Sequence, residues 1–317
     1  MTEFLEPFDR LLADIASPAA VRAIERGGSA AAMWQGIADS GFLDALVPAE
    51  RGGAGLPLAA VQPLWMALGR HAVPLPVGET MIARALLDVP PPGAVALAVA
   101  EAGCDTIVPS GLVADQLLLE AGGALYLVAA QRNATGVPAS LAARMRWDAL
   151  PDAVASAPAG GLRALAAVLR AALIAGAAER LTEMTAAYAN ERIQFGKPIG
   201  RQQALQQQMA VMAEEMVAAR IASQLGCAGG LPPSPAAAAT AKSVASRAAA
   251  RVAATAHAVH GAIGISEEHD LQLFTRRLHE WRLADGSESY WNRLLGAERL
   301  ADAGRSVDFV RARLTAA

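Results

Sequence analysis

Aromatic residues are scarce in this sequence. Phe, Trp and Tyr make up only 4% of its 317 residues, although 54% of the residues are hydrophobic. Alanine supplies much of the apolar content, and alanine is the best helix former. Small side chains in place of rings let helices pack closely, and the chain is long enough to bury a sizeable core. The sequence therefore predicts a mainly α protein.

Cysteine is also rare, and neither sign of charge dominates. Cys104 and Cys227 have no CxxC or Cys/His spacing, which predicts two reduced thiols. His257 and His260 lie three residues apart but have no acidic or cysteine partner at a metal-binding spacing, so we expect no metal site. A net charge of −3 provides no basic surface for nucleic acid.

The sequence contains no long hydrophobic run that is free of charged residues. The opening MTEFLEPFDR is acidic and has no apolar core, so it does not resemble a signal peptide. The longest apolar run, residues 162–181, is interrupted by charges that include Arg170, Glu179 and Arg180, which a membrane span would not tolerate. We expect a cytoplasmic protein without membrane contact.

The periodicity of apolar residues changes twice along the chain. Residues 1–88 show helical spacing and predict an N-terminal helical domain. Residues 89–158 contain short apolar runs between Gly, Pro and Asp, which predict a small β domain of five or six strands. Helical spacing returns over 159–317 and predicts an antiparallel helical bundle. Glycines and prolines divide this part into helices near 160–193, 200–228, 235–262, 268–284 and 287–315, the last broken near Gly304.

Three blocks of sequence carry a family resemblance. GFLDALVPAERGGAGLP, residues 41–57, is a glycine-rich loop. NERIQFGKPIG, residues 190–200, places an arginine, a phenylalanine and a glycine at the end of a helix, with Gln203 soon after. HGAIGISEEHDLQLFTRR, residues 260–277, is a second glycine-rich block. Together with the order of domains, these blocks resemble the acyl-CoA dehydrogenase family of flavoproteins over nearly the whole chain.

The resemblance implies a set of FAD-binding residues. Arg192 would meet the FAD pyrophosphate of a neighbouring subunit, Phe195 would lie against the cofactor, and Gln203 would contact its adenosine half. A guanidinium is a permanently charged, forked donor that suits phosphate oxygens. In the third block, Gly261, Ala262 and Gly264 would let the backbone approach FAD. Ala258 and Ala262 replace the glutamine and the second glycine of the family, which weakens those contacts.

Two features cast doubt on independent activity. The loop that holds the flavin ring and the thioester in the family has no counterpart between Val89 and Pro158, so the β domain looks truncated. The family's base position falls on Asp285, which would remove the α proton of an acyl-CoA. Asp285 also fits a competing interpretation, because Asp285 or Ser287 could cap the last helix and Asp285-x-x-Glu288 matches a capping box.

Three functions therefore remain open. The first is an FAD-dependent dehydrogenase that introduces an α,β double bond into an acyl-CoA thioester. The second is a degenerate subunit that completes the FAD and acyl-CoA sites of an unlike, full-length partner, for instance in a heterotetramer. The third is a helical binding protein without flavin. The resemblance implies a homodimer or dimer of dimers for the first, built through the C-terminal bundle.

Overall fold

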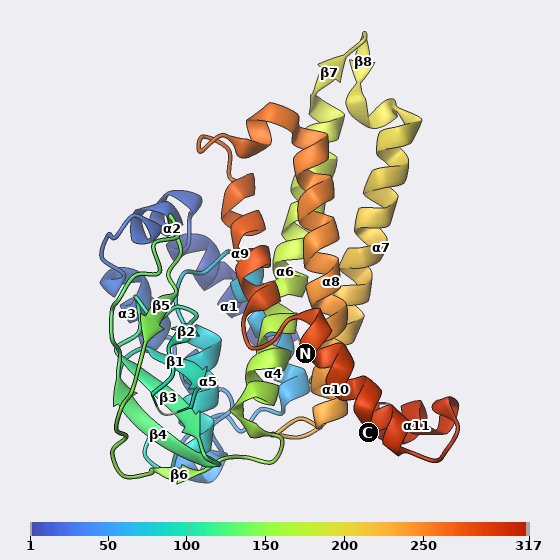
Figure 1. The fold of residues 1–317 in the computed structure, drawn as a ribbon. Helices are drawn as coiled ribbons and strands as arrows, with labels where there is room; N and C mark the ends of the chain where they lie inside the picture. Colours follow the sequence, from blue (N-terminus) through green and yellow to red (C-terminus); the bar gives the residue numbers. More distant parts are fainter. Residues whose placement is uncertain (1, 102, 315–317) are drawn as a thin grey trace.

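The protein has the mainly α architecture that the sequence predicts: N-terminal helices, a small β region and an antiparallel helical bundle (Figure 1). This is seen in a computed structural model that describes residues 2–101 and 103–314. The N-terminal helices and the β region lie together beside one part of the bundle, whose far end projects beyond them (Figure 1). The exact boundaries of three separate domains stay a prediction.

The N-terminal part contains five α-helices, all with a face turned to the core. They are α1 (Thr2–Ile15), α2 (Pro18–Glu25), α3 (Ala31–Asp39), α4 (Leu58–Arg70) and α5 (Val77–Leu86). Two short 3-10 turns, η1 (Phe42–Asp44) and η2 (Ala49–Arg51), lie in the glycine-rich loop between α3 and α4. Trp65 on α4 is fully buried, so one of the few aromatic side chains anchors this part of the core.

The β region contains six strands in two small sheets. They are β1 (Val95–Val99), β2 (Thr106–Val108), β3 (Gln116–Ala121), β4 (Ala124–Ala129), β5 (Ala143–Met145) and β6 (Ala155–Ser156). One sheet has the order β1-β3-β4-β6, with β1 parallel to β3 and the other pairs antiparallel, and β2 pairs with β5 in the second. Gly122 and Gly123 both have positive φ at the turn between β3 and β4, as a tight hairpin requires.

In the described part of the bundle, three helices are long and three are shorter. They are α6 (Gly161–Glu191), α7 (Gln203–Gly226), α8 (Pro235–His260), α9 (Leu271–Leu283), α10 (Glu288–Ala301) and α11 (Ser306–Arg313). The predicted break near Gly304 falls between α10 and α11. Between α6 and α7 the chain forms a small hairpin, β7 (Ile193–Gln194) and β8 (Lys197–Pro198), followed by η3 (Ile199–Arg201). A further 3-10 turn, η4 (Gly261–Ile265), follows α8.

Two glycines let α4 and α6 cross at backbone contact. A Cβ added at Gly176 of α6 would lie 1.9 Å from the carbonyl oxygen of Met66, and one at Gly69 of α4 would lie 2.0 Å from that of Leu173. Any side chain at these positions would force the helices apart. The crossing fixes the N-terminal helices against the bundle.

Helix α6 is the central helix of the bundle. It is the one helix of the described chain that is long and apolar enough to cross a membrane, but 89% of its most apolar stretch is buried within the protein. Its neighbours α4, α7, α8 and α9 cover it, as expected for the core helix of a bundle.

Candidate active site

A buried ion-pair cluster joins three separate segments of the chain. Arg170 of α6 is 1% exposed, and its Nη1 donates to Oε1 of Glu79 on α5 at 2.6 Å. Its Nε donates to Oδ2 of Asp285, in the turn after α9, at 3.0 Å. Burial alone would lower the pKa of Arg170, but the two carboxylates outweigh it and the pKa lies above its ordinary value. Arg170 is therefore charged and holds Asp285 in place.

Lys242 of α8 fixes the backbone of the same turn. Its side chain is fully buried, and Nζ donates to the carbonyl oxygens of Arg282 at 2.8 Å and Gly286 at 2.9 Å, and to Oγ of Ser246 at 3.0 Å. Burial lowers the pKa of Lys242 to about 7, with nearby Asp285 acting in the opposite direction. The turn that carries Asp285 is thus held at its backbone by the Lys242 amine and at its side chain by the Arg170 guanidinium.

The capping-box interpretation of Asp285 is wrong. The N-cap of α10 is Ser287, which makes no side-chain capping bond. Asp285 has a left-handed backbone (φ 58°), and its carboxylate pairs with Arg170 and not with the start of α10. Glu288 pairs with Arg282 and does not reach back to the cap. A buried guanidinium offers a charged donor, whereas the start of a helix offers only neutral backbone amides.

A cavity of about 560 Å³ lies on the open side of Asp285. One wall comes from α9 and its end, with Arg277, Glu280, Trp281 and Asp285. The facing wall comes from the β region, with residues 107–110 and 135–144 contributing. Its size lies in the range of small-molecule and cofactor sites. We call it the active-site cavity.

The predicted FAD residues lie elsewhere, at the far end of the bundle. Arg192 ends α6, Phe195 occupies the tip of the β7–β8 hairpin, and Gln203 begins α7. Phe195 is 89% exposed and has φ 53°, and with Gly196 (φ 76°) it forms the hairpin turn. The side chain of Arg192 is exposed and has no hydrogen-bond or ion-pair partner among the described residues. The hairpin projects beyond the helices in Figure 1.

The second glycine block lies at the same end of the bundle. Gly261, Ala262 and Gly264 belong to η4, directly after α8; the first two are exposed and Gly264 is buried. His260 stacks on Tyr188 of α6 with ring centroids 4.4 Å apart, which ties this turn to the end of α6. Burial lowers the pKa of His257 and of His260, so both favour the neutral form. No group of His, Cys, Asp or Glu in the part of the chain that the structure describes has a metal-binding arrangement.

The two sets of residues cannot serve one site within a single chain. Arg170, which binds Asp285, precedes Arg192 by 22 positions on α6. At about 1.5 Å per residue, that places the two arginine backbones about 33 Å apart. Arg192, Phe195 and Gln203 therefore lie too far from Asp285 to line the same cavity of their own chain.

Arg192 and Phe195 suit the pyrophosphate part of FAD. An exposed, unpaired guanidinium beside an exposed ring offers a forked donor and an apolar surface, which suit a pyrophosphate and the cofactor next to it. Ile107, Pro109 and Ser110 line the active-site cavity, so part of the β region contributes to a pocket. That the β region lacks the family's flavin-ring loop stays a prediction.

This architecture, with its helical bundle, small β region and projecting hairpin, is that of the acyl-CoA dehydrogenases, and sequence relatives support an acyl-CoA dehydrogenase-type oxidoreductase. Residues 164–301 match the family described as acyl-CoA dehydrogenase, C-terminal domain. The chain is 36% identical over 284 residues to acyl-CoA dehydrogenase IpdE2 of Mycobacterium tuberculosis, covering 85% of this chain and 87% of the relative. It is 34% identical to the IpdE2 of Mycolicibacterium smegmatis, covering 83% and 87%. The chain belongs to the acyl-CoA dehydrogenase family.

Solved structures agree on the fold. The ChsE4-ChsE5 complex from Mycobacterium tuberculosis has a chain that matches with a TM-score of 0.81 at 22% identity, over 96% of this chain and 98% of that one. A chain described as the Tcur3481-Tcur3483 steroid ACAD G363A variant matches with a TM-score of 0.80 at 25% identity, over 95% and 98%.

Proposed function

We propose that this chain is one subunit of an FAD-dependent acyl-CoA dehydrogenase built from unlike subunits, in which it completes sites shared with a full-length partner. The reaction is α,β-dehydrogenation of an acyl-CoA thioester. The observation that carries the proposal is the pairing of Asp285 with the buried Arg170 at 3.0 Å, which engages the base candidate of this chain. The separation of about 33 Å along α6 between the cavity end and the hairpin end supports sites shared between subunits. The hairpin end has an unpaired Arg192 and an exposed Phe195, and neither lines the cavity beside Asp285 of its own chain.

The roles of this chain's residues follow from their positions. FAD, when bound, supplies the acceptor for the hydrogen that leaves the β carbon as hydride. Arg192 would bind the pyrophosphate of that FAD, Phe195 would cover an apolar part of the cofactor, and Gln203 would hydrogen-bond its adenosine half. Gly261, Ala262 and Gly264 would allow close backbone approach at the same end.

Asp285 is poorly placed to take a proton from the substrate. One of its oxygens accepts from Arg170, and protonation would leave that buried guanidinium with Glu79 as its only charged partner. This supports a base supplied by the partner. The assembly is supported by the description of a related structure as a complex of two differently named chains, ChsE4 and ChsE5. The description of another as a steroid ACAD favours a steroid-derived acyl group as substrate class.

A second candidate is a homodimer or dimer of dimers that works alone. It is favoured by the position of Asp285 in the wall of a cavity of about 560 Å³. In this candidate Asp285 would be the base, and each hairpin would reach the FAD of an identical neighbour.

The test compares the chain purified alone with the chain co-expressed with a full-length relative from the same organism. We expect flavin absorbance and oxidation of acyl-CoA by an artificial electron acceptor only in the co-expressed assembly, which light scattering should show to contain both chains. Full turnover by the chain alone would support the second candidate. Absence of flavin and of acyl-CoA binding in both preparations would contradict both candidates.

A further inference from the structure

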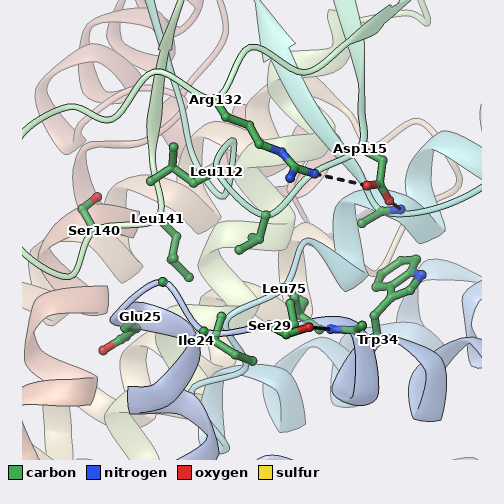
Figure 2. Close-up of a pocket in the computed structure, with 16 residues that line it drawn as sticks. Ile24, Glu25, Ser29, Trp34, Leu75, Leu112, Asp115, Arg132, Ser140 and Leu141 are labelled. Atoms are coloured by element: carbon green, nitrogen blue, oxygen red, sulfur yellow. Dashed lines mark hydrogen bonds and ion pairs between the residues drawn. The ribbon is translucent and has the colours of Figure 1, made fainter.

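A second cavity, of about 530 Å³, lies between the N-terminal helices and the β region. Figure 2 shows Ile24, Glu25, Ser29 and Trp34 of the α2–α3 segment on one side, and Leu112, Asp115, Arg132 and Leu141 of the β region on the other. We call it the chamber. None of the residues assigned above to the base or to FAD lines it.

The chamber borders the active-site cavity. Ser140 and Leu141 line both. Glu25 lines the chamber, and its Oε1 accepts from Nη2 of Arg277, which lines the active-site cavity, at 2.9 Å. The wall between the two spaces is therefore thin: one loop segment and one ion pair.

The walls of the chamber suit a ligand that is largely apolar but carries oxygen. Ile24, Trp34, Leu75, Leu112 and Leu141 provide apolar surface. The hydroxyls of Ser29 and Ser140 accept from backbone amides at 3.3 and 3.2 Å, and among the described residues neither donates its proton.

Two arginines add further donors. Nε of Arg277 is buried at the boundary and has no hydrogen-bond partner among the described residues, which is costly unless a ligand or water satisfies it. Arg132 is 60% exposed at the rim and makes two long contacts, an ion pair to Asp115 and a hydrogen bond to the carbonyl oxygen of Ala114, both at 3.4 Å. Both favour hydroxyl, ketone or carboxylate oxygens on the ligand.

We propose that the chamber receives the distal, oxygen-bearing end of a bulky cyclic acyl group whose thioester lies in the active-site cavity. This inference rests on the proposed function, because it assumes an acyl-CoA substrate. Leu141 and the Glu25–Arg277 pair then limit the size and shape of the acyl groups that can extend from the active-site cavity into the chamber. Short acyl groups never reach the chamber, so chamber residues discriminate only among large substrates.

The α3 helix offers a matched pair of variants. Ala31 and Ala32 are neighbouring exposed alanines in its first turn, but only Ala31 lines the chamber. Ala31→Phe would fill part of the chamber, and Ala32→Phe would add the same ring outside it. Thermal melting of both variants checks that the fold is kept.

The probes are butyryl-CoA, cholyl-CoA with its hydroxylated steroid ring system, and the hydroxyl-free cholanoyl-CoA. Isothermal titration calorimetry measures their Kd on the full chain in the assembly in which it is isolated. We expect Ala31→Phe to raise the Kd of cholyl-CoA about tenfold and Ala32→Phe to leave it within about twofold. Butyryl-CoA should bind all three proteins equally, and cholanoyl-CoA should bind more weakly than cholyl-CoA.

The possible outcomes distinguish a failure of the chamber hypothesis from a failure of the proposed function. Equal binding of cholyl-CoA by the two variants, or binding of butyryl-CoA with no binding of cholyl-CoA, would overturn the chamber and leave the proposed function intact. Equal affinity for cholanoyl-CoA and cholyl-CoA would overturn the role of the polar walls. If no thioester binds, the proposed function is wrong and the chamber falls with it.

Discussion

Arg170 binds the carboxylate of Asp285: Nε of the arginine donates to Oδ2 of the aspartate at 3.0 Å, and the two residues are 115 positions apart in the sequence. The carboxylate at the position that the family resemblance assigns to the base is thus one half of an ion pair. Glu79 binds the other side of the same guanidinium. This arrangement makes Asp285 important for structure whether or not it takes part in chemistry.

Asp285→Asn should destabilise the protein by about 2 kcal/mol, because the hydrogen bond to the charged Arg170 becomes weaker and loses its ionic partner. Urea denaturation followed by circular dichroism measures the loss. Ser287→Ala is the matched control: Ser287 is the N-cap of α10 but makes no side-chain capping bond, so stability should hold. An Asn variant as stable as wild type would show that the pair contributes little.

Arg192→Ala should weaken FAD binding about tenfold or more, since a charged donor to phosphate contributes about 1.5–3 kcal/mol. The melting temperature without FAD should not change, because the side chain is exposed and unpaired. Flavin absorbance per assembly gives the occupancy. Arg293→Ala, at an exposed and equally unpaired arginine of α10, should leave occupancy unchanged; equal losses in both variants would speak against a role for the hairpin.

Lys242 should make stability depend on pH. Its pKa is about 7 in the folded protein against an ordinary 10.5, so between these values the unfolded chain binds more protons than the folded one. The free energy of unfolding should therefore rise as the pH increases from about 7 to about 10.5, by at most about 1.4 kcal/mol per pH unit. The rise should be absent in Lys242→Met, as urea titrations at several pH values can check. The same slope in both proteins would assign it to other groups.

Gly176→Ala should destabilise the fold by about 3 kcal/mol or prevent folding, because its Cβ would lie 1.9 Å from the Met66 carbonyl oxygen where α4 crosses α6. Gly296→Ala is the control: this glycine lies inside α10 with no atom within 4 Å of an added Cβ. That change should raise stability by about 0.5–1 kcal/mol. A harmless Gly176→Ala would mean that the crossing is looser than the structure indicates.

Most of the helices and strands could be predicted because their signals are local. The runs that became β1, β3 and β4 are bounded by turn residues, and the ends of α6–α10 follow glycines and prolines. The β7–β8 hairpin was predicted only as a helix end, because two-residue strands leave no periodicity. Arg192, Phe195 and Gln203 were found through resemblance alone.

The ion-pair cluster could not be read from the sequence. Glu79, Arg170 and Asp285 lie on three segments separated by 91 and 115 positions, and no local pattern links them. One signal was present: Arg170 interrupts the apolar stripe of a core helix, and a buried arginine requires a carboxylate partner. Lys242 could not be distinguished by sequence from Arg247 and Arg251, the other basic residues of α8, although it is fully buried while the two arginines are exposed.

Because α6 is one unbroken helix, it fixes the distance between the Arg170–Asp285 pair and the β7–β8 hairpin. Inserting a single residue between Arg170 and Arg192 would shift the hairpin by about 1.5 Å and rotate it by about 100° around the helix axis. Arg192 and Phe195 would then face a different direction, even though no original side chain had been changed. Along this segment the number of residues is therefore constrained as well as their identity, and a deletion or insertion there would harm the assembly even if every original side chain were retained.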